Sequence, residues 1–112
     1  PLYAVLEAGR GRICVARYRH VEGLPVQEDS TQLWESAAWL PPAGELVLVA
    51  GEVSAALAEQ LLASPQADDI ALASLAGSVR RAGYLAELAW ERLQAGRVDD
   101  LDTTQPDYIQ LA

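Results

Sequence analysis

The hydrophobic pattern of this chain changes period partway along the sequence. In the first part, residues 2–7 are apolar and rich in types that favour strands, and residues 12–19 alternate between polar and apolar types. Residues 8–11 separate these runs and contain Gly9 and Gly11, which favour a turn. Two strand-like runs around a glycine-containing turn predict an antiparallel β-hairpin.

The second part has the pattern of strands that alternate with helices. Residues 45–50 form a short, almost wholly apolar run, which is typical of a strand buried on both faces. Residues 52–62 carry apolar side chains at helical spacing and predict a helix that ends at Ser64 and Pro65. Residues 69–73 then predict another short buried strand.

The longest predicted helix covers residues 74–95, with Gly96 at its C-terminal cap. Gly83 weakens it locally, so a break into two helices near this residue is also compatible with the sequence. We expect an apolar stripe along this helix to be buried, and we expect two residues of the preceding helix to join it against the strand at 46–50. The stripe consists of Leu75, Val79, Ala82, Ala86, Ala89 and Leu93, and the expected core contacts are Leu57, Leu61, Val79 and either Leu85 or Ala86.

The segment between the two parts is less regular. Residues 20–29 contain a glycine and a proline and predict a loop that leads into a short third strand or an edge segment. Residues 30–40 predict a brief helix that begins at Asp29 or Ser30 and ends at the two prolines that follow.

This order of elements predicts the fold class. Antiparallel strands followed by strand–helix crossover units imply an α/β fold with a mixed sheet and helices packed on its faces. The length of 112 residues gives room for one domain. Because the chain begins directly inside a predicted strand, we expect residues 1–112 to be one domain of a longer protein.

Composition and charge narrow the function classes. Hydrophobic residues make up 51% of the chain and charged residues 21%, which predicts a soluble domain with a packed core. The formal net charge of −8 disfavours direct binding to nucleic acid. No apolar run is long enough to span a membrane, and the N-terminus lacks the features of a signal peptide. Cys14 is the single cysteine, so no internal disulfide forms, which suits a cytoplasmic location.

Residue types that carry out chemistry are few and scattered. His20 has no Cys, His or carboxylate neighbours at ligand spacing, and we interpret it as a surface residue. We interpret Cys14 as a small buried apolar residue. Gly9, Arg10 and Gly11 open no predicted helix, so we favour a hairpin turn over a phosphate-binding loop. The sequence therefore predicts no catalytic residue, no cofactor-binding residue and no metal ligand.

The remaining distinctive residues also favour structural roles. Trp34, Trp39 and Trp90 are far apart in the sequence, which indicates packing in the core or at an interface. Residues 98–102 are acidic but lack the central glycine of a calcium-binding loop, so we interpret them as a solvated connector.

Two segments near the ends of the chain resemble one family. Residues 6–18, LEAGRGRICVARY, are similar to the hairpin that opens the C-terminal domain of the TsaB (YeaZ) family, where the pattern IDAR-x-GEVY-x-A-x-Y is typical. Residues 95–100, AGRVDD, and residues 105–109, QPDYI, are similar to the pattern AG…V(D)…PxYLR that closes this domain. The matches lie in the right order and at roughly the right separation, so the resemblance spans the chain.

The resemblance implies a fold and a function. TsaB proteins are inactive relatives of glycoprotease-like (O-sialoglycoprotein endopeptidase-like) proteins, built from two ribonuclease-H-like lobes of the actin-like ATPase fold. In the cytoplasm they act as a scaffold for the catalytic homologue TsaD, which with TsaE adds threonylcarbamoyl to adenosine 37 of tRNA. The chain resembles only the second lobe. The resemblance therefore implies a non-catalytic C-terminal lobe whose N-terminal lobe is not part of this sequence.

The hairpin departs from the family pattern. The family's Asp-Ala-Arg corresponds to Glu-Ala-Gly at residues 7–9, with Arg10 one place later, and the glutamate that follows the turn glycine is Arg12 here. By the resemblance, Glu7, Arg10 and Gly11 lie at the cleft between the lobes or contact a partner. We expect a surface near this turn to support a homodimer when the other lobe is missing.

Two alternatives remain open. The chain is also compatible with a lobe of a glycoprotease-like metallopeptidase or ATPase whose chemistry lies in a missing N-terminal part. A His-x-x-x-His pair upstream of Pro1 would favour that alternative. The other alternative is an unrelated mixed α/β domain.

Overall fold

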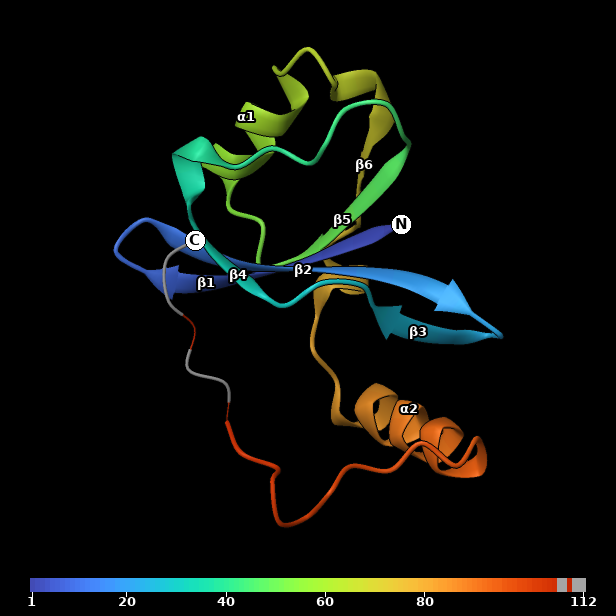
Figure 1. Ribbon diagram of the computed structural model, residues 1–112. Coiled ribbons are helices and arrows are strands. Elements are labelled where there is room, and N and C mark those ends of the chain that lie inside the picture. The colour runs from blue at the N-terminus through green and yellow to red at the C-terminus, as the bar shows by residue number, and fades with distance from the viewer. Residues whose placement is uncertain (107–108, 110–112) are drawn as a thin grey trace.

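The computed structural model describes residues 1–106 and 109 of the chain. Within these residues, strands from both parts of the sequence join in one mixed sheet, which consists of β1 (Leu2–Gly9), β2 (Arg12–Val21), β3 (Leu24–Gln27), β4 (Gln32–Glu35), β5 (Val47–Gly51) and β6 (Ile70–Leu72). Their order is β3-β2-β1-β5-β6, with β4 also paired to β2. Helix α1 (Ala55–Leu62) covers one face of the sheet, and helix α2 (Ala82–Gln94) lies on the side of the other face (Figure 1). The predicted α/β fold with a mixed sheet is confirmed.

The predicted hairpin at the start of the chain is confirmed. Strands β1 (Leu2–Gly9) and β2 (Arg12–Val21) are antiparallel, and a register shift between Glu7 and Gly9 makes a bulge just before the turn. The two turn residues, Arg10 and Gly11, have φ angles of 56° and 71°. Two consecutive positive φ angles define the tight hairpin turn that matches the twist of the strands.

The loop predicted at residues 20–29 is a second tight hairpin instead. Strand β2 runs on through His20 to Val21, and β3 (Leu24–Gln27) pairs back on it antiparallel. Glu22 and Gly23 make the turn with φ angles of 52° and 81°. Glutamate is uncommon at positive φ, which explains why the sequence signal for this turn is weak. The predicted short third strand is confirmed as β3.

The brief helix predicted at residues 30–40 is wrong. Strand β4 (Gln32–Glu35) occupies this segment and pairs antiparallel with the first half of β2, followed by a short 3₁₀ helix, η1 (Ser36–Ala38). Pairing with β2 gives the backbone groups of residues 32–35 hydrogen-bond partners in the sheet. The strand also buries Leu33 on one face of the sheet and turns Trp34 toward the core on the other.

The second part of the chain forms the predicted strand–helix–strand unit. Strand β5 (Val47–Gly51) pairs in parallel with β1, and β6 (Ile70–Leu72) pairs in parallel with β5. Helix α1 connects them and begins later than predicted, at Ala55, because the Ser54 hydroxyl accepts a hydrogen bond from the Leu57 amide at 3.1 Å and caps the helix.

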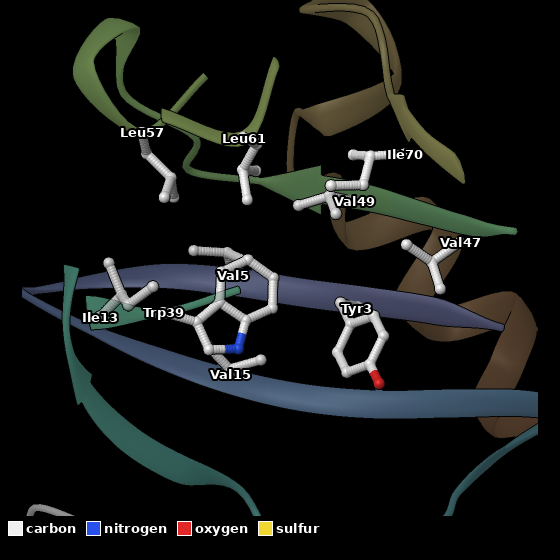
Figure 2. Packing of buried hydrophobic residues seen from close by; sticks show 10 residues of the cluster. All are labelled: Tyr3, Val5, Ile13, Val15, Trp39, Val47, Val49, Leu57, Leu61 and Ile70. Atoms are coloured by element: carbon white, nitrogen blue, oxygen red, sulfur yellow. The ribbon is translucent and has the colours of Figure 1, made fainter. Parts of the chain in front are cut away.

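The hydrophobic core lies between α1 and the sheet. Leu57 and Leu61 are 1% and 0% exposed and point from α1 toward the side chains of β1, β2 and β5 (Figure 2), as predicted. Trp39 is buried in the core and meets the Tyr3 ring edge-on, with centroids 5.7 Å apart. The cluster consists of Tyr3, Val5, Ile13, Val15, Trp39, Val47, Val49, Leu57, Leu61 and Ile70. The predicted packing role of the tryptophans therefore holds for Trp39 and for partly buried Trp34, whereas Trp90 is 61% exposed.

The long helix predicted at residues 74–95 is shorter and is not packed. A 3₁₀ helix, η3 (Ala76–Ser78), comes first, Val79 and Arg81 are extended, and α2 begins at Ala82. The break thus precedes Gly83, and it places β-branched Val79 in a conformation that suits it. The predicted core contacts Val79 and Leu85 are 53% and 70% exposed, so that part of the predicted core is wrong.

The rest of the predicted stripe, namely Leu75, Ala82, Ala86, Ala89 and Leu93, is exposed as well. The helix does end as predicted, with Gly96 at a φ of 74°. Burial of the strand at 45–50 on both faces is also wrong, because Leu48 is 42% exposed.

Candidate functional site

A hollow of about 510 Å³ lies between the first hairpin turn and the start of α1. All three residues that the sequence singled out, Glu7, Arg10 and Gly11, line this hollow. Ser54, at the N-terminal cap of α1, and Gln60, in the second turn of this helix, line the hollow from the other side. The structure therefore brings the predicted site residues together at one place.

Two arginines flank this hollow, and their electrostatic surroundings differ. Arg12 Nε lies 3.2 Å from Glu35 Oε1, so its charge is compensated by the neighbouring strand β4. Arg10 is exposed at the tip of the turn and makes no salt bridge within residues 1–106 and 109. A non-glycine residue at a φ of 56° is sterically disfavoured. Arg10 is thus a cation held at a strained turn position and open to an acidic group.

Glu52 connects the site to the rest of the fold, and the sequence reasoning did not single it out. Its Oε2 accepts a hydrogen bond from the backbone amide of Glu7 at 3.0 Å, and its Oε1 lies 3.1 Å from Arg80 Nη2. One carboxylate therefore ties the hairpin, the end of β5 and the segment before α2. Its position directly after a strand was the available signal.

Gln60 fixes the opposite wall. Its Nε2 donates to the carbonyl oxygens of Ser36 at 3.0 Å and of Trp39 at 2.9 Å. These bonds hold α1 against the segment that follows β4. Sequence reasoning missed this role because a glutamine in an amphipathic helix is usually interpreted as solvent-exposed.

A second polar cluster surrounds Arg17 on the α1 face of the sheet. Its guanidinium lies 2.7 Å from Glu45 Oε1 and 3.3 Å from Glu28 Oε2, and it donates to the Tyr3 hydroxyl at 2.6 Å. The hydrogen bond with Glu45 raises the pKa of Arg17, and the hydrogen bond from Arg17 holds the pKa of Glu45 below its ordinary value. Because these groups satisfy one another, we assign this cluster a structural role.

The residues with reactive side chains remain separate. His20 is exposed on β2, as expected for a surface residue, although it lies in a strand and not in a loop. Cys14 is half-buried on the face opposite α1, which differs from the predicted full burial. Among the described residues, no three His, Cys, Asp or Glu side chains gather as a metal site requires. In the same part of the chain, every helix is too short or too polar to cross a bilayer.

The acidic connector at residues 98–102 is exposed, as predicted. The motif at residues 105–109 includes Asp107 and Tyr108, which lie outside the described residues.

Comparison of the sequence with models of protein families and with curated proteins gives no match. The geometry of the hollow therefore carries the functional argument. It presents an uncompensated arginine and a glutamate on a recessed surface, and such a surface is suited to binding an acidic group of another chain or lobe.

Proposed function

We propose that this chain is a non-catalytic scaffold lobe of the complex that adds threonylcarbamoyl to adenosine 37 of tRNA. In this role it supports a TsaD-like catalytic homologue and, through the intact protein, a TsaE-like ATPase in the cytoplasm. The lobe itself neither catalyses a reaction nor binds nucleic acid directly. The proposal starts from the resemblance of residues 6–18 and 95–109 to the TsaB family.

The observation that carries the proposal is the order of the strands. A ribonuclease-H-like lobe has an antiparallel three-stranded meander whose first strand also pairs in parallel with later strands. Here β1 pairs antiparallel with β2 and in parallel with β5, which in turn pairs in parallel with β6. Strands β3 and β4 both pair with β2 and together take the place of the third strand. This arrangement supports a lobe of that fold.

The hollow at the hairpin turn supplies the proposed contact surface. In a protein of two lobes, the surfaces at the cleft bury roughly 600–1,500 Å² between the lobes. We assign Glu7, Arg10 and Gly11 to this interlobe surface, with Arg10 as the residue that pairs with a carboxylate of the other lobe or of the partner. The net charge of −8 agrees with a lobe that leaves contact with tRNA to its partner.

The proposal is tested by titrating the TsaD homologue of the same organism in a calorimeter. One titration uses this chain, and the other uses a longer protein that also contains the N-terminal lobe. We expect the longer protein to bind at least tenfold more tightly, because the proposal places most of the docking surface on the N-terminal lobe. If neither protein binds, or if threonylcarbamoyl transfer proceeds at full rate without them, the proposed function is wrong.

A matched pair of variants of the longer protein tests the hollow. Arg10→Gln removes the uncompensated cation at the turn, and Arg19→Gln removes an exposed arginine that lies elsewhere on β2 and pairs with Glu28. We expect Arg10→Gln to weaken binding of TsaD, or to loosen the two lobes in solution scattering, and Arg19→Gln to change neither. Equal behaviour of the two variants would remove Arg10 from the contact surface.

A further inference from the structure

Another hollow, of about 430 Å³, lies on the α1 face of the sheet beside the Arg17 cluster. We call it the aromatic pocket, because Tyr3, Trp34 and Trp39 all line it. Tyr3 and Trp39 belong to the core and lie next to one another (Figure 2), and Trp34 is half-buried. Exposed Leu40 and Pro42 extend the apolar lining to the surface. The volume is in the range of pockets that hold small molecules.

Hydrogen bonds hold two walls of the aromatic pocket in place. On one side, Gln27 Nε2 donates to the backbone carbonyl of Asp29 at 2.8 Å, which fixes the connection between β3 and β4. On the other side, residues 39–42 form the wall, and Gln66 Nε2 donates to the carbonyl of Pro41 at 2.8 Å. A pocket whose walls are fixed before binding loses little free energy to ordering when a ligand enters.

The polar atoms of two of the aromatic residues are already used within the fold. The Trp34 indole N–H donates to Gln32 Oε1 at 3.1 Å, and the Tyr3 hydroxyl accepts a hydrogen bond from Arg17 at 2.6 Å. The Arg17 guanidinium also lies over the Tyr3 ring, 5.4 Å from its centroid, and Trp39 is only 3% exposed. The ring of Trp34 is therefore the aromatic surface that remains for a ligand. An indole ring attracts a cation more strongly than the other aromatic rings do.

The charged residues that line the aromatic pocket are Arg17, Glu28 and Asp29. Arg17 is paired with Glu28 at 3.3 Å and with Glu45 at 2.7 Å. Glu28 is also paired with Arg19 at 2.8 Å, so the charges of the two arginines and the two glutamates balance. Asp29 is exposed and makes no salt bridge within residues 1–106 and 109. The pocket therefore presents one uncompensated carboxylate beside an aromatic lining, which suits a positively charged ligand.

We propose that the aromatic pocket binds a quaternary ammonium group. Such a group is positive overall but apolar at its surface, because methyl groups surround the nitrogen, and proteins recognise it with aromatic rings. Its methyl groups pack on Trp34, Leu40 and Pro42, and Asp29 supplies the opposite charge. The inference does not rest on the proposed scaffold function, because it uses a surface apart from the hollow at the first hairpin turn.

The test follows the amide chemical shifts of residues 1–112 during a titration with choline. Its matched control is 3,3-dimethylbutan-1-ol, which has the shape of choline but carries carbon in place of the charged nitrogen. We expect choline to bind about tenfold more tightly than this neutral alcohol, because only choline is attracted by the Trp34 ring and the Asp29 carboxylate. The shifts should centre on residues 28–34 and 39–42.

A short peptide that carries trimethyllysine identifies the source of the group. The peptide presents the same cation as choline on a protein side chain, and the peptide with unmodified lysine is its control. Binding of either choline or the trimethyllysine peptide supports the site. Tighter binding of the peptide assigns the ligand to a methylated lysine of another protein, and tighter binding of choline assigns it to a small molecule.

Two pairs of variants separate this pocket from the general acidity of the chain. Asp29→Asn should weaken choline binding about threefold, whereas Asp102→Asn, which removes an exposed carboxylate outside the pocket, should leave it unchanged. Trp34→Leu keeps an apolar side chain on β4 and should weaken choline more than the neutral alcohol. Trp90→Leu, at an exposed position of α2, should weaken neither. Circular dichroism checks that each variant is folded.

Three results would overturn the proposal. The first is equal affinity for choline and the neutral alcohol, which would mean that the pocket does not recognise the charge. The second is equal weakening by Asp29→Asn and Asp102→Asn, which would mean that only the net charge acts. The third is that neither choline nor the trimethyllysine peptide shifts the amides of residues 28–34 and 39–42. Asp29 is exposed, so its variant decides the matter even if Trp34→Leu fails to fold.

Discussion

The shorter of the two helices of this chain is packed in the core, and the longer one is exposed. Helix α1 has 8 residues and buries Leu57 and Leu61 completely, whereas α2 has 13 residues and buries none within the described part of the chain. Both sequences have apolar residues at helical spacing. The comparison teaches that length and amphipathic pattern do not decide whether a helix packs.

The attachment of each helix accounts for the difference. Short connections to the parallel strands β5 and β6 hold α1 at both ends, and Gln60 fastens its middle with two hydrogen bonds. Helix α2 is tied to the sheet through the segment before it, where Arg80 pairs with Glu52, and through a 4.0 Å contact between Arg97 and Glu22 beyond its other end. A crossover between parallel strands places its helix on the sheet, and a C-terminal helix lacks that constraint.

The largest expected effect is a difference in stability between two leucine-to-alanine variants, one in each helix. Leu61→Ala leaves a cavity in a site that is 0% exposed and should lower the free energy of unfolding by about 3 kcal/mol. Leu88→Ala, at 38% exposure on α2, should lower it by less than about 1 kcal/mol. Urea denaturation followed by tryptophan fluorescence measures both values.

Leu62→Ala is the control for helix propensity, because Leu62 lies in α1 but is 55% exposed. It should behave like Leu88→Ala. A large loss of stability from Leu88→Ala would mean that α2 packs against the sheet in solution.

The packed side of the sheet could be predicted from the sequence because its pattern is local. Leu57 and Leu61 fall one helical turn apart, and Gly51 and Ser64 mark the limits of their segment. The side of this helix that faces the sheet therefore follows from the helical period of its apolar residues. The first hairpin is signalled equally well by glycines between an apolar run and an alternating run. The same kind of reasoning assigned Val79 and Leu85 to the core and was wrong, because the pattern gives the apolar side of a helix but not the surface that receives it.

The errors in the middle of the chain have another cause. Strand β4 is short and is defined by its pairing with β2, a contact between residues about twenty positions apart that no local pattern reports. Of the site, Glu7, Arg10 and Gly11 were named from the family resemblance and their contact role stays a prediction, whereas the turn that carries them follows from a local pattern. The position of Glu52 directly after a strand marks it as a candidate, but its role and that of Gln60 come from partners at residues 7 and 36–39 and could not be predicted.

An effect of intermediate size is the pH dependence of stability that arises from Glu45 and Arg17. Arg17 holds the pKa of Glu45 below its ordinary value of 4.5, so the folded state favours the ionised carboxylate. A carboxyl group with a lowered pKa stabilises the fold above its ordinary pKa, and this contribution is lost as the pH falls through the lowered pKa. The urea midpoint should therefore drop between pH 5 and pH 2 less steeply in Glu45→Gln than in the parent chain. Glu59→Gln, which removes an exposed carboxylate of α1, should keep the parent profile.

The smallest expected effect tests whether α2 folds independently of the core. Gly83 has open space around its Cα and lies inside the helix, so Gly83→Ala should stabilise α2 by about 0.5–1 kcal/mol through helix propensity. Gly96 also has open space, but its φ of 74° makes Gly96→Ala cost about 1 kcal/mol at the end of the same helix. A 13-residue helix without tertiary packing is marginal in water, so both changes should appear in the amide exchange of α2 and in the helical circular dichroism. The urea midpoint of the core should stay constant in both variants. A parallel shift of that midpoint would show that α2 unfolds together with β5 and α1, and the contrast between the two helices would then be wrong.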